Sequence, residues 1–126
     1  MKFPYDSHYF PPAPSVEIWL GTPGESLASD PHQALVDTGA DISLVPLKHI
    51  KPLQTVPDDH RYLRSQWGGR RRVAIYSLDI GIGSMRLPSV EVVADERGTE
   101  IILGHNVLNR LAVMLDRPNR VTELLD

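Results

Sequence analysis

Asp37-Thr38-Gly39 is the segment of the sequence with the clearest chemical potential, because it directly follows the apolar residues 34–36. An apolar strand that leads into an Asp-Thr-Gly turn places a carboxylate at the strand end, with its backbone fixed and its oxygens open to a cleft. Such a carboxylate can act as a general base toward water. The tripeptide is also typical of an ordinary β-turn, in which Asp and Gly are favoured, so it is only suggestive by itself.

A second segment near the C-terminus repeats the same order of features. Residues 101–103 are apolar, Gly104 follows them, and Val107, Leu108 and Leu111 then recur at helical spacing. This pattern predicts a short strand that ends at a glycine, followed by a short helix over residues 105–111. The paired pattern is more specific than the tripeptide alone.

The elements that must position these residues are predicted to be short strands. Eleven prolines and nine glycines are spread through the chain, which favours a mostly β fold over a few long helices. One helical turn is expected at residues 47–50. Gly68-Gly69 favours a hairpin turn between two strands, because glycine readily adopts positive φ. The expected strands cover residues 16–20, 33–36, 42–46, 60–67, 71–80, 85–94, 101–103, 112–115 and 121–125.

Residues 1–15 differ from the rest of the chain. They hold four prolines and four aromatic residues, and the prolines at 11, 12 and 14 disfavour regular hydrogen bonding. We expect an N-terminal arm here and one folded domain over residues 16–126. The arm is expected either to be a flexible tail or to dock on its own domain or on a partner.

Composition excludes several classes of function. The chain has 126 residues and a formal charge of −3, which fits one domain and disfavours broad binding to nucleic acid or anionic membranes. The absence of cysteine excludes disulfides and Cys-ligated metals. The five histidines lack metal-ligand spacing, so no metal or cofactor is expected. The longest apolar run, residues 111–115, is too short for a membrane span, and a soluble cytoplasmic protein is expected.

The order of these elements resembles the retropepsin-like aspartic proteases, the family of retroviral proteases and their cellular and bacterial relatives. The resemblance covers residues 16 to about 125 and implies a closed all-β barrel with a flap hairpin and one short C-terminal helix. It implies that Asp37 is catalytic, that Thr38 links two active-site turns, and that Gly39 lets those turns approach. This chemistry needs two carboxylates that share one proton. Because the chain holds one Asp-Thr-Gly, the resemblance implies a functional homodimer.

The resemblance also assigns residues around the catalytic turn. The hairpin over residues 60–80 would be a flap that closes over a polypeptide substrate, although an ordinary exposed hairpin has the same pattern. Substrate contacts are expected from the turn and from the flap tip: Ala40, Asp41, Trp67, Gly68 and Gly69. Structural support is expected from the second segment: Leu103, Gly104, His105 and Asn106.

Two features leave alternatives open. His105 stands where retroviral proteases usually have arginine, and we expect it either to contact Asp41 or to be an unpaired surface histidine. Arginines in the hairpin are expected either to favour acidic residues in the substrate or to form a solvated run of charge. These are Arg64, Arg70, Arg71 and Arg72.

The function predicted from the sequence is that of an aspartic endopeptidase. Water would be activated between the Asp37 side chains of a homodimer and would hydrolyse a peptide bond without a cofactor. A different class of function is a retropepsin fold kept as a dimerisation or peptide-binding module with little or no turnover, since a fold does not guarantee activity.

Overall fold

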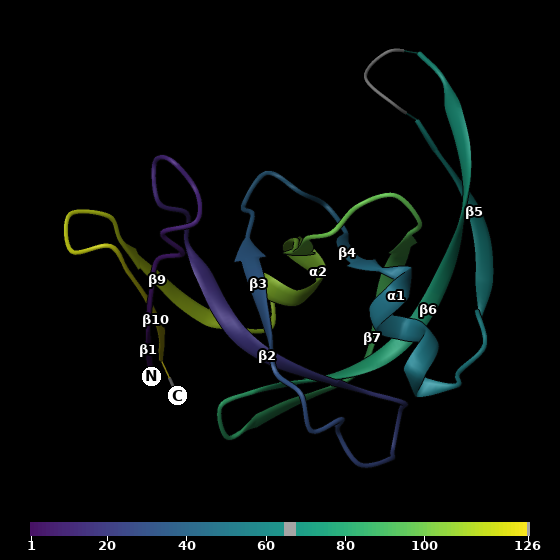
Figure 1. Cartoon of the computed structure of the whole chain (residues 1–126), viewed down its shortest axis with the longest axis horizontal. Coiled ribbons are helices and arrows are strands. Elements are labelled where there is room, and N and C mark those ends of the chain that lie inside the picture. The colour runs from purple at the N-terminus through teal and green to yellow at the C-terminus, as the bar shows by residue number, and fades with distance from the viewer. Residues whose placement is uncertain (65–67, 126) are drawn as a thin grey trace.

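Six strands of the computed structural model close into a barrel (Figure 1). The structure describes residues 1–64 and 68–125. Within them the barrel strands pair in the order β2-β3-β8-β4-β7-β6, and β6 pairs back to β2. The predicted closed all-β barrel is therefore confirmed. Its strands are β2 (Ser15–Gly21), β3 (His32–Val36), β4 (Ser43–Pro46), β6 (Arg70–Ile82), β7 (Met85–Asp95) and β8 (Ile101–Leu103).

A small second sheet lies beside the barrel and joins the two ends of the chain (Figure 1). Its strand order is β1-β10-β9, and both pairings are antiparallel. The strands are β1 (Lys2–Pro4), β9 (Ala112–Asp116) and β10 (Val121–Leu125). The sequence predicted the β9–β10 hairpin but did not predict β1. The first residues thus dock on their own chain, which was one of the alternatives for the N-terminal segment.

Helices are short, as the density of prolines and glycines predicted. The predicted helical turn is α1 (Leu47–Ile50), which continues into a 3₁₀ turn at Lys51–Leu53. The predicted C-terminal helix is α2 (His105–Leu108), and it ends three residues earlier than expected. No helix in residues 1–64 or 68–125 is long and apolar enough to cross a membrane.

The barrel is filled by side chains that alternate along its strands. On β2, Val16, Ile18 and Leu20 are at most 1% exposed, whereas Glu17 and Trp19 between them are partly exposed. This period of two places one face of the strand in the core, which is why the segment folds as a strand. Burial of each of these Leu or Ile side chains stabilises the folded state by roughly 1.5–3 kcal/mol. The packed core thereby fixes the backbone from which the turns project.

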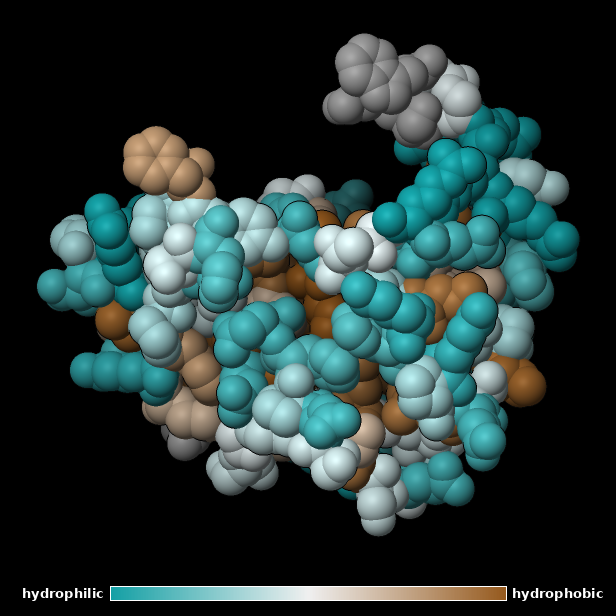
Figure 2. Space-filling view, in the orientation of Figure 1, coloured by the Kyte–Doolittle hydropathy of each residue, from teal (hydrophilic) through white to brown (hydrophobic). Residues whose placement is uncertain are grey.

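The predicted hairpin is confirmed. β5 (Asp59–Arg64) pairs with the first part of β6, with Arg64 opposite Arg70, and this hairpin projects beyond the barrel (Figure 1). Its surface is hydrophilic along most of its length (Figure 2). Gly68 has a φ of +84°, which fits the predicted use of glycine in the turn. The predicted tip residue Trp67 lies outside the described residues.

Asp79 is a buried carboxylate at the place where β2 meets β6. It is 2% exposed and accepts hydrogen bonds from the amides of Gly24 (3.0 Å) and Ser89 (2.8 Å). Its Oδ2 also accepts from Nε (2.9 Å) and Nη2 (2.7 Å) of Arg86. Burial alone would raise the pKa of Asp79, but these hydrogen bonds outweigh it and lower the pKa. The carboxylate, which lies on β6, ties the loop after β2 to β7.

Replacing Asp79 with Asn should lower the free energy of unfolding by about 2–3 kcal/mol at pH 7, because Arg86 loses its charged partner. The contribution of a carboxylate with a lowered pKa is complete above the unfolded value of about 3.9 and is lost as the pH falls through the folded value. The difference in unfolding free energy between wild type and Asp79→Asn should therefore be smaller at pH 3 than at pH 7. Urea unfolding at pH 7 and pH 3 measures it, with the exposed Glu96→Gln as control. An equal difference at both pH values would contradict the prediction.

Candidate active site

The site is built where two parallel strands end side by side. β3 and β8 are parallel neighbours in the barrel, and their last residues, Val36 and Leu103, are directly paired. The next amide, of Asp37, donates to the carbonyl of Leu103 at 3.0 Å. The two glycine-containing segments of the sequence therefore leave the barrel at one place, although they are far apart along the chain.

The turn after β3 holds the Asp37 carboxylate in place. The amide of Gly39 donates to Asp37 Oδ1 at 2.9 Å, and the amide of Ala40 donates to the Asp37 carbonyl at 3.2 Å. Asp37, Thr38 and Gly39 are exposed in the single chain. Within residues 1–64 and 68–125 no other group donates to this carboxylate. Its backbone is fixed, while its oxygens are available to water and to a second protein surface.

Gly104 lets the second segment pack directly against this turn. A Cβ at position 104 would lie 2.7 Å from the carbonyl oxygen of Ala40 and 2.8 Å from that of Ile42. The next amide, of His105, donates to the same Ala40 carbonyl at 2.8 Å. By contrast, a Cβ on Gly39 would meet only Asp37 Oδ1, at 3.3 Å, among the described atoms of this chain. Gly104 is therefore required by the fold of one chain, whereas Gly39 is not.

A polar network centred on the buried Ser43 side chain supports the turn from behind. Ser43 is fully buried and donates from its amide (3.0 Å) and its hydroxyl (2.8 Å) to Asn106 Oδ1. The Ser43 hydroxyl also accepts from the amide of Gly104 at 2.9 Å, and Asn106 Nδ2 donates to the Glu91 carbonyl at 2.6 Å. These bonds connect β4 and β7 to Gly104 and to α2. Ser43 was not among the residues predicted from the sequence, where its signal is that of a single polar residue within the apolar run 42–46.

His105 lies against the same turn. Its Nε2 lies 2.5 Å from the carbonyl oxygen of Thr38, and its Nδ1 lies 3.6 Å from Asp41 Oδ1. Of the two alternatives for His105, the contact with Asp41 is the one present. The Asp41 side chain is 98% exposed, so this contact contributes little to stability. The hydrogen bond to Thr38 ties α2 to the backbone beside Asp37.

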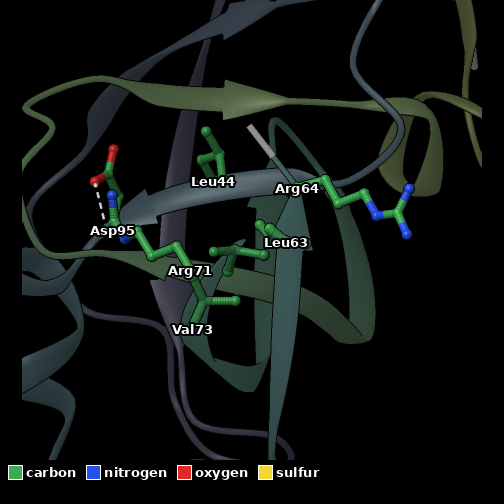
Figure 3. Close-up of a pocket in the computed structure, with 7 residues that line it drawn as sticks. Leu44, Leu63, Arg64, Arg71, Val73 and Asp95 are labelled. Carbon is green, nitrogen blue, oxygen red and sulfur yellow. Dashed lines mark ion pairs between the residues drawn. The ribbon is translucent and has the colours of Figure 1, made fainter. Parts of the chain in front are cut away.

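A pocket of about 230 Å³ lies between β4, the end of β7 and the outer part of the hairpin (Figure 3). Arg71 reaches Asp95 on one side of it (3.9 Å), and Arg64 extends away on the other side. Leu44, which follows the Asp37 turn on β4, contributes to an apolar lining. The lining residues are Leu44, Leu63, Arg64, Arg71, Val73, Val93 and Asp95.

Arginines of the hairpin contact other residues of the same chain. Arg61 pairs with Asp59 (3.1 Å) and Glu91 (3.0 Å), and the Arg70 guanidinium lies 4.9 Å from the centre of the Tyr62 ring. Arg71 also pairs with Asp95 at 3.9 Å. Whether the predicted arginines favour acidic residues in the substrate or form a solvated run of charge stays a prediction.

Comparison with protein families places this site in a known context. The model of the gag-polyprotein putative aspartyl protease family matches residues 26–110, which include the Asp37 turn, the hairpin and the Gly104 segment. The chain belongs to this family. The predicted retropepsin-like membership is therefore confirmed. No curated protein matches the sequence.

Solved structures of this aspartyl protease class share the fold. A retropepsin-like aspartic protease from Rickettsia conorii is 14% identical, with a TM-score of 0.68 over 98% of this chain and 88% of that chain. The Simian foamy virus (mac) protease is 18% identical, with a TM-score of 0.57 over 75% of this chain and 91% of that chain.

The structure brings most of the predicted aspartyl protease residues to one place. The Asp37 turn, with Ala40 and Asp41, lies against the predicted support residues from Leu103 to Asn106. The predicted flap glycines, Gly68 and Gly69, are exposed at the far end of the hairpin. Their contact with substrate stays a prediction. Among the described residues, no group of three or more potential metal ligands comes together.

Proposed function

We propose that the chain is an aspartic endopeptidase that works as a homodimer. The observation that carries this proposal is the Asp37 carboxylate, which is held by the Gly39 amide and is otherwise open in a chain with one such turn. Two carboxylates are needed for the reaction, and a two-fold axis beside this turn supplies the second from another copy.

The two carboxylates take different roles in hydrolysis. The ionised Asp37 accepts a proton from water, whose oxygen attacks the carbonyl carbon of the scissile bond. The protonated Asp37 of the second copy donates its proton to the carbonyl oxygen, which gives a neutral tetrahedral intermediate. When the C–N bond breaks, the first carboxyl returns its proton to the departing nitrogen and the second recovers one from the intermediate. The products are a carboxylic acid and an amine.

The proposed substrate is an extended polypeptide lying between the Asp37 turn and the hairpin. The pocket beside Leu44 suits an apolar side chain of that substrate, because its walls include Leu63, Val73 and Val93. The hairpin closes over the bound chain and excludes water from the reacting bond.

Incubation of the purified protein with a diverse peptide mixture, followed by mass spectrometry of new termini, tests this function. We expect discrete cleavage sites with an apolar residue near the scissile bond. If the protein binds peptides from the mixture but produces no new termini, this would favour a binding module and would contradict the peptidase assignment.

Activity should also depend steeply on protein concentration. Well below the dimer dissociation constant, the cleavage rate should fall with about the square of the total concentration, because each site needs two chains. Initial rates over a dilution series, with an inert carrier protein to prevent adsorption, measure this dependence. A strictly linear dependence across the whole series would mean that one chain holds a complete site.

A further inference from the structure

Another pocket, of about 250 Å³, lies between the N-terminal arm and the turn that joins β9 to β10. The arm is docked on this turn, because the amide of Tyr5 donates to the carbonyl of Arg120 at 2.9 Å. Figure 1 shows the arm loop and this turn at the end of the small sheet that lies away from the chain termini. We call it the arm pocket, and it shares no lining residue with the pocket beside Leu44. It is lined by Tyr5, Pro11, Pro12, Pro14, Arg117 and Arg120.

The two arginines of the arm pocket carry positive charge that the chain does not neutralise. In the described part of the chain, neither Arg117 nor Arg120 makes an ion pair. Carboxylates next to the lining residues in the sequence have other partners. Asp116 accepts from the amide (3.2 Å) and the side chain (2.9 Å) of Asn119, and Asp6 accepts from an amide within the arm at 2.9 Å. The fork of donors on a guanidinium matches the two oxygens of a carboxylate, so the pair is suited to bind one.

The backbone around the arm pocket is well supported. The amide of Arg120 donates to the carbonyl of Arg117 at 3.2 Å, which closes the turn that carries both side chains. On the other side, Asp6 and Ala13 exchange two backbone hydrogen bonds, at 2.7 and 3.1 Å, at the base of the arm loop. The three lining prolines of this loop have φ fixed by their rings. A pocket with such a backbone loses little conformational entropy when a ligand binds.

Tyr5 adds a hydrogen-bond donor that lacks an acceptor within the chain. Its hydroxyl oxygen is buried and makes no hydrogen bond to any described residue. Buried polar groups in proteins are almost always paired, so an unpaired phenol on a residue that lines a pocket indicates an acceptor supplied from outside. A carboxylate held by the two arginines is such an acceptor.

The arm also presents apolar surface around the pocket. The prolines form one wall, and Phe10, which directly precedes Pro11, is fully exposed. Aromatic and proline side chains bind apolar groups with little loss of their own conformational freedom. The apolar surface therefore continues along the arm beyond the lining residues. A ligand that uses both features carries a carboxylate next to an apolar side chain and is longer than a small organic acid.

We propose that the arm pocket binds an acidic segment of a polypeptide. A carboxylate of this segment lies between Arg117 and Arg120, and a neighbouring apolar side chain lies against the prolines of the arm. A polypeptide fits better than a nucleic acid, because the chain has a formal charge of −3 and the arginines have an acidic residue, Asp116, beside them in the turn.

The arm connects this pocket to the strand that carries the catalytic turn. The carbonyl of Pro14, a lining residue, accepts from the amide of Val36 at 2.9 Å, and Asp37 follows. A polypeptide in the arm pocket is thus held by the same chain that presents Asp37. Its use as an anchor for substrate outside the cleft rests on the proposed function, whereas binding itself does not.

Fluorescence anisotropy with a labelled peptide tests the binding. The probe contains Glu-Phe pairs separated by glycine, and the comparison peptide has Gln in place of each Glu. Every protein in the assay carries Asp37→Asn, so that the probe stays intact. We expect saturable binding of the probe, with an affinity at least about tenfold higher than that of the Gln peptide. Equal affinity for the two peptides would overturn the proposal.

Charge variants locate the binding. Arg117→Gln and Arg120→Gln should each weaken probe binding at least about fivefold. Arg97→Gln is the matched control, because it removes the same charge from another exposed arginine that has no ion pair in the described residues. It should leave the affinity within about twofold of the parent protein. An equal loss in Arg97→Gln, or a loss confined to the hairpin variant Arg72→Gln, would overturn the assignment to the arm pocket.

Tyr5→Phe separates binding from folding. Because the hydroxyl has no partner in the free chain, its removal should leave the midpoint of urea unfolding unchanged or raise it. Probe binding should nevertheless weaken about threefold or more, because the carboxylate loses a donor. A lowered midpoint together with unchanged binding would overturn the role of this hydroxyl as a donor to the ligand.

A competitor and an activity assay complete the test. Succinate, a free dicarboxylic acid, should displace the probe only at concentrations at least about a hundredfold higher than the unlabelled peptide. Displacement at equal concentrations would show a site for small acids and overturn the polypeptide assignment. If the wild-type protein cleaves peptides but the probe does not bind, the arm pocket proposal fails and the peptidase assignment stands. Probe binding by a protein that cleaves no peptide supports the arm pocket and overturns the proposed function.

Discussion

Asp37→Asn should abolish peptide hydrolysis while the barrel and the dimer persist. The amide has nearly the volume of the carboxyl group but can neither take a proton from water nor share one with the opposite Asp37. We expect kcat/KM to fall at least about 10³-fold. The measurement is cleavage of a peptide identified in the mixture experiment, with sedimentation and circular dichroism to verify dimer and fold. Asp30→Asn, which removes one exposed carboxylate before β3, is the charge control.

Mixing the proteins sharpens this test. Dimers of wild type with Asp37→Asn hold one carboxylate and should be inactive. At a ninefold excess of the variant, about a tenth of the wild-type chains pair with each other by mass action. Activity per wild-type chain should therefore fall to about a tenth. Undiminished activity in this mixture would show that Asp37 acts without a partner.

Gly104→Ala should lower both the stability of the protein and its activity, because it disturbs the fold of the site. The new Cβ would lie 2.7 and 2.8 Å from two backbone carbonyl oxygens, which cannot turn aside as a flexible side chain can. The Gly104 amide is also bound to the buried Ser43 hydroxyl, so a shift of the backbone strains that network. We expect a loss of about 2–4 kcal/mol in unfolding free energy and at least a tenfold loss of activity.

Gly39→Ala is the matched comparison, because it adds the same methyl group on the exposed side of the same turn. Its Cβ would contact only Asp37 Oδ1, at 3.3 Å, in the part of the chain that is described. We expect its stability to lie within about 1 kcal/mol of wild type. Urea unfolding of both variants measures the difference. A Gly104→Ala protein as stable as wild type would refute the packing argument.

The sequence predicted those elements whose local residue pattern agrees with the strand pairing in the structure. Asp37 follows one strand and Gly104 follows another, and each of these barrel strands ends in apolar residues, at 34–36 and at 101–103. The hairpin could be predicted because Gly68 marks the turn between two strand-like segments. In each case the residues that define the element lie close together in the chain.

The features that the sequence did not predict depend on distant partners. β1 has three residues, one of them Pro4, and exists because β10 offers a ladder more than a hundred positions away. Ser43 is visible in the sequence as a polar residue in an apolar run, but its role is defined only when Asn106 and Gly104 are placed beside it. The early end of α2 has a similar cause, because the residues after Leu108 turn to enter the small sheet. Periodicity alone cannot report these tertiary effects.

The parallel pairing of β3 with β8 also determines when the site can form during folding. Val36 and Leu103 are separated by most of the barrel sequence, so their contact requires closure of a long loop and is slow compared with local hairpins. As the chain emerges from the ribosome, the Asp37 turn stays without its supporting residues until Leu103 to Asn106 have been synthesised. The candidate site is consequently completed late in biogenesis, after most of the barrel strands have emerged.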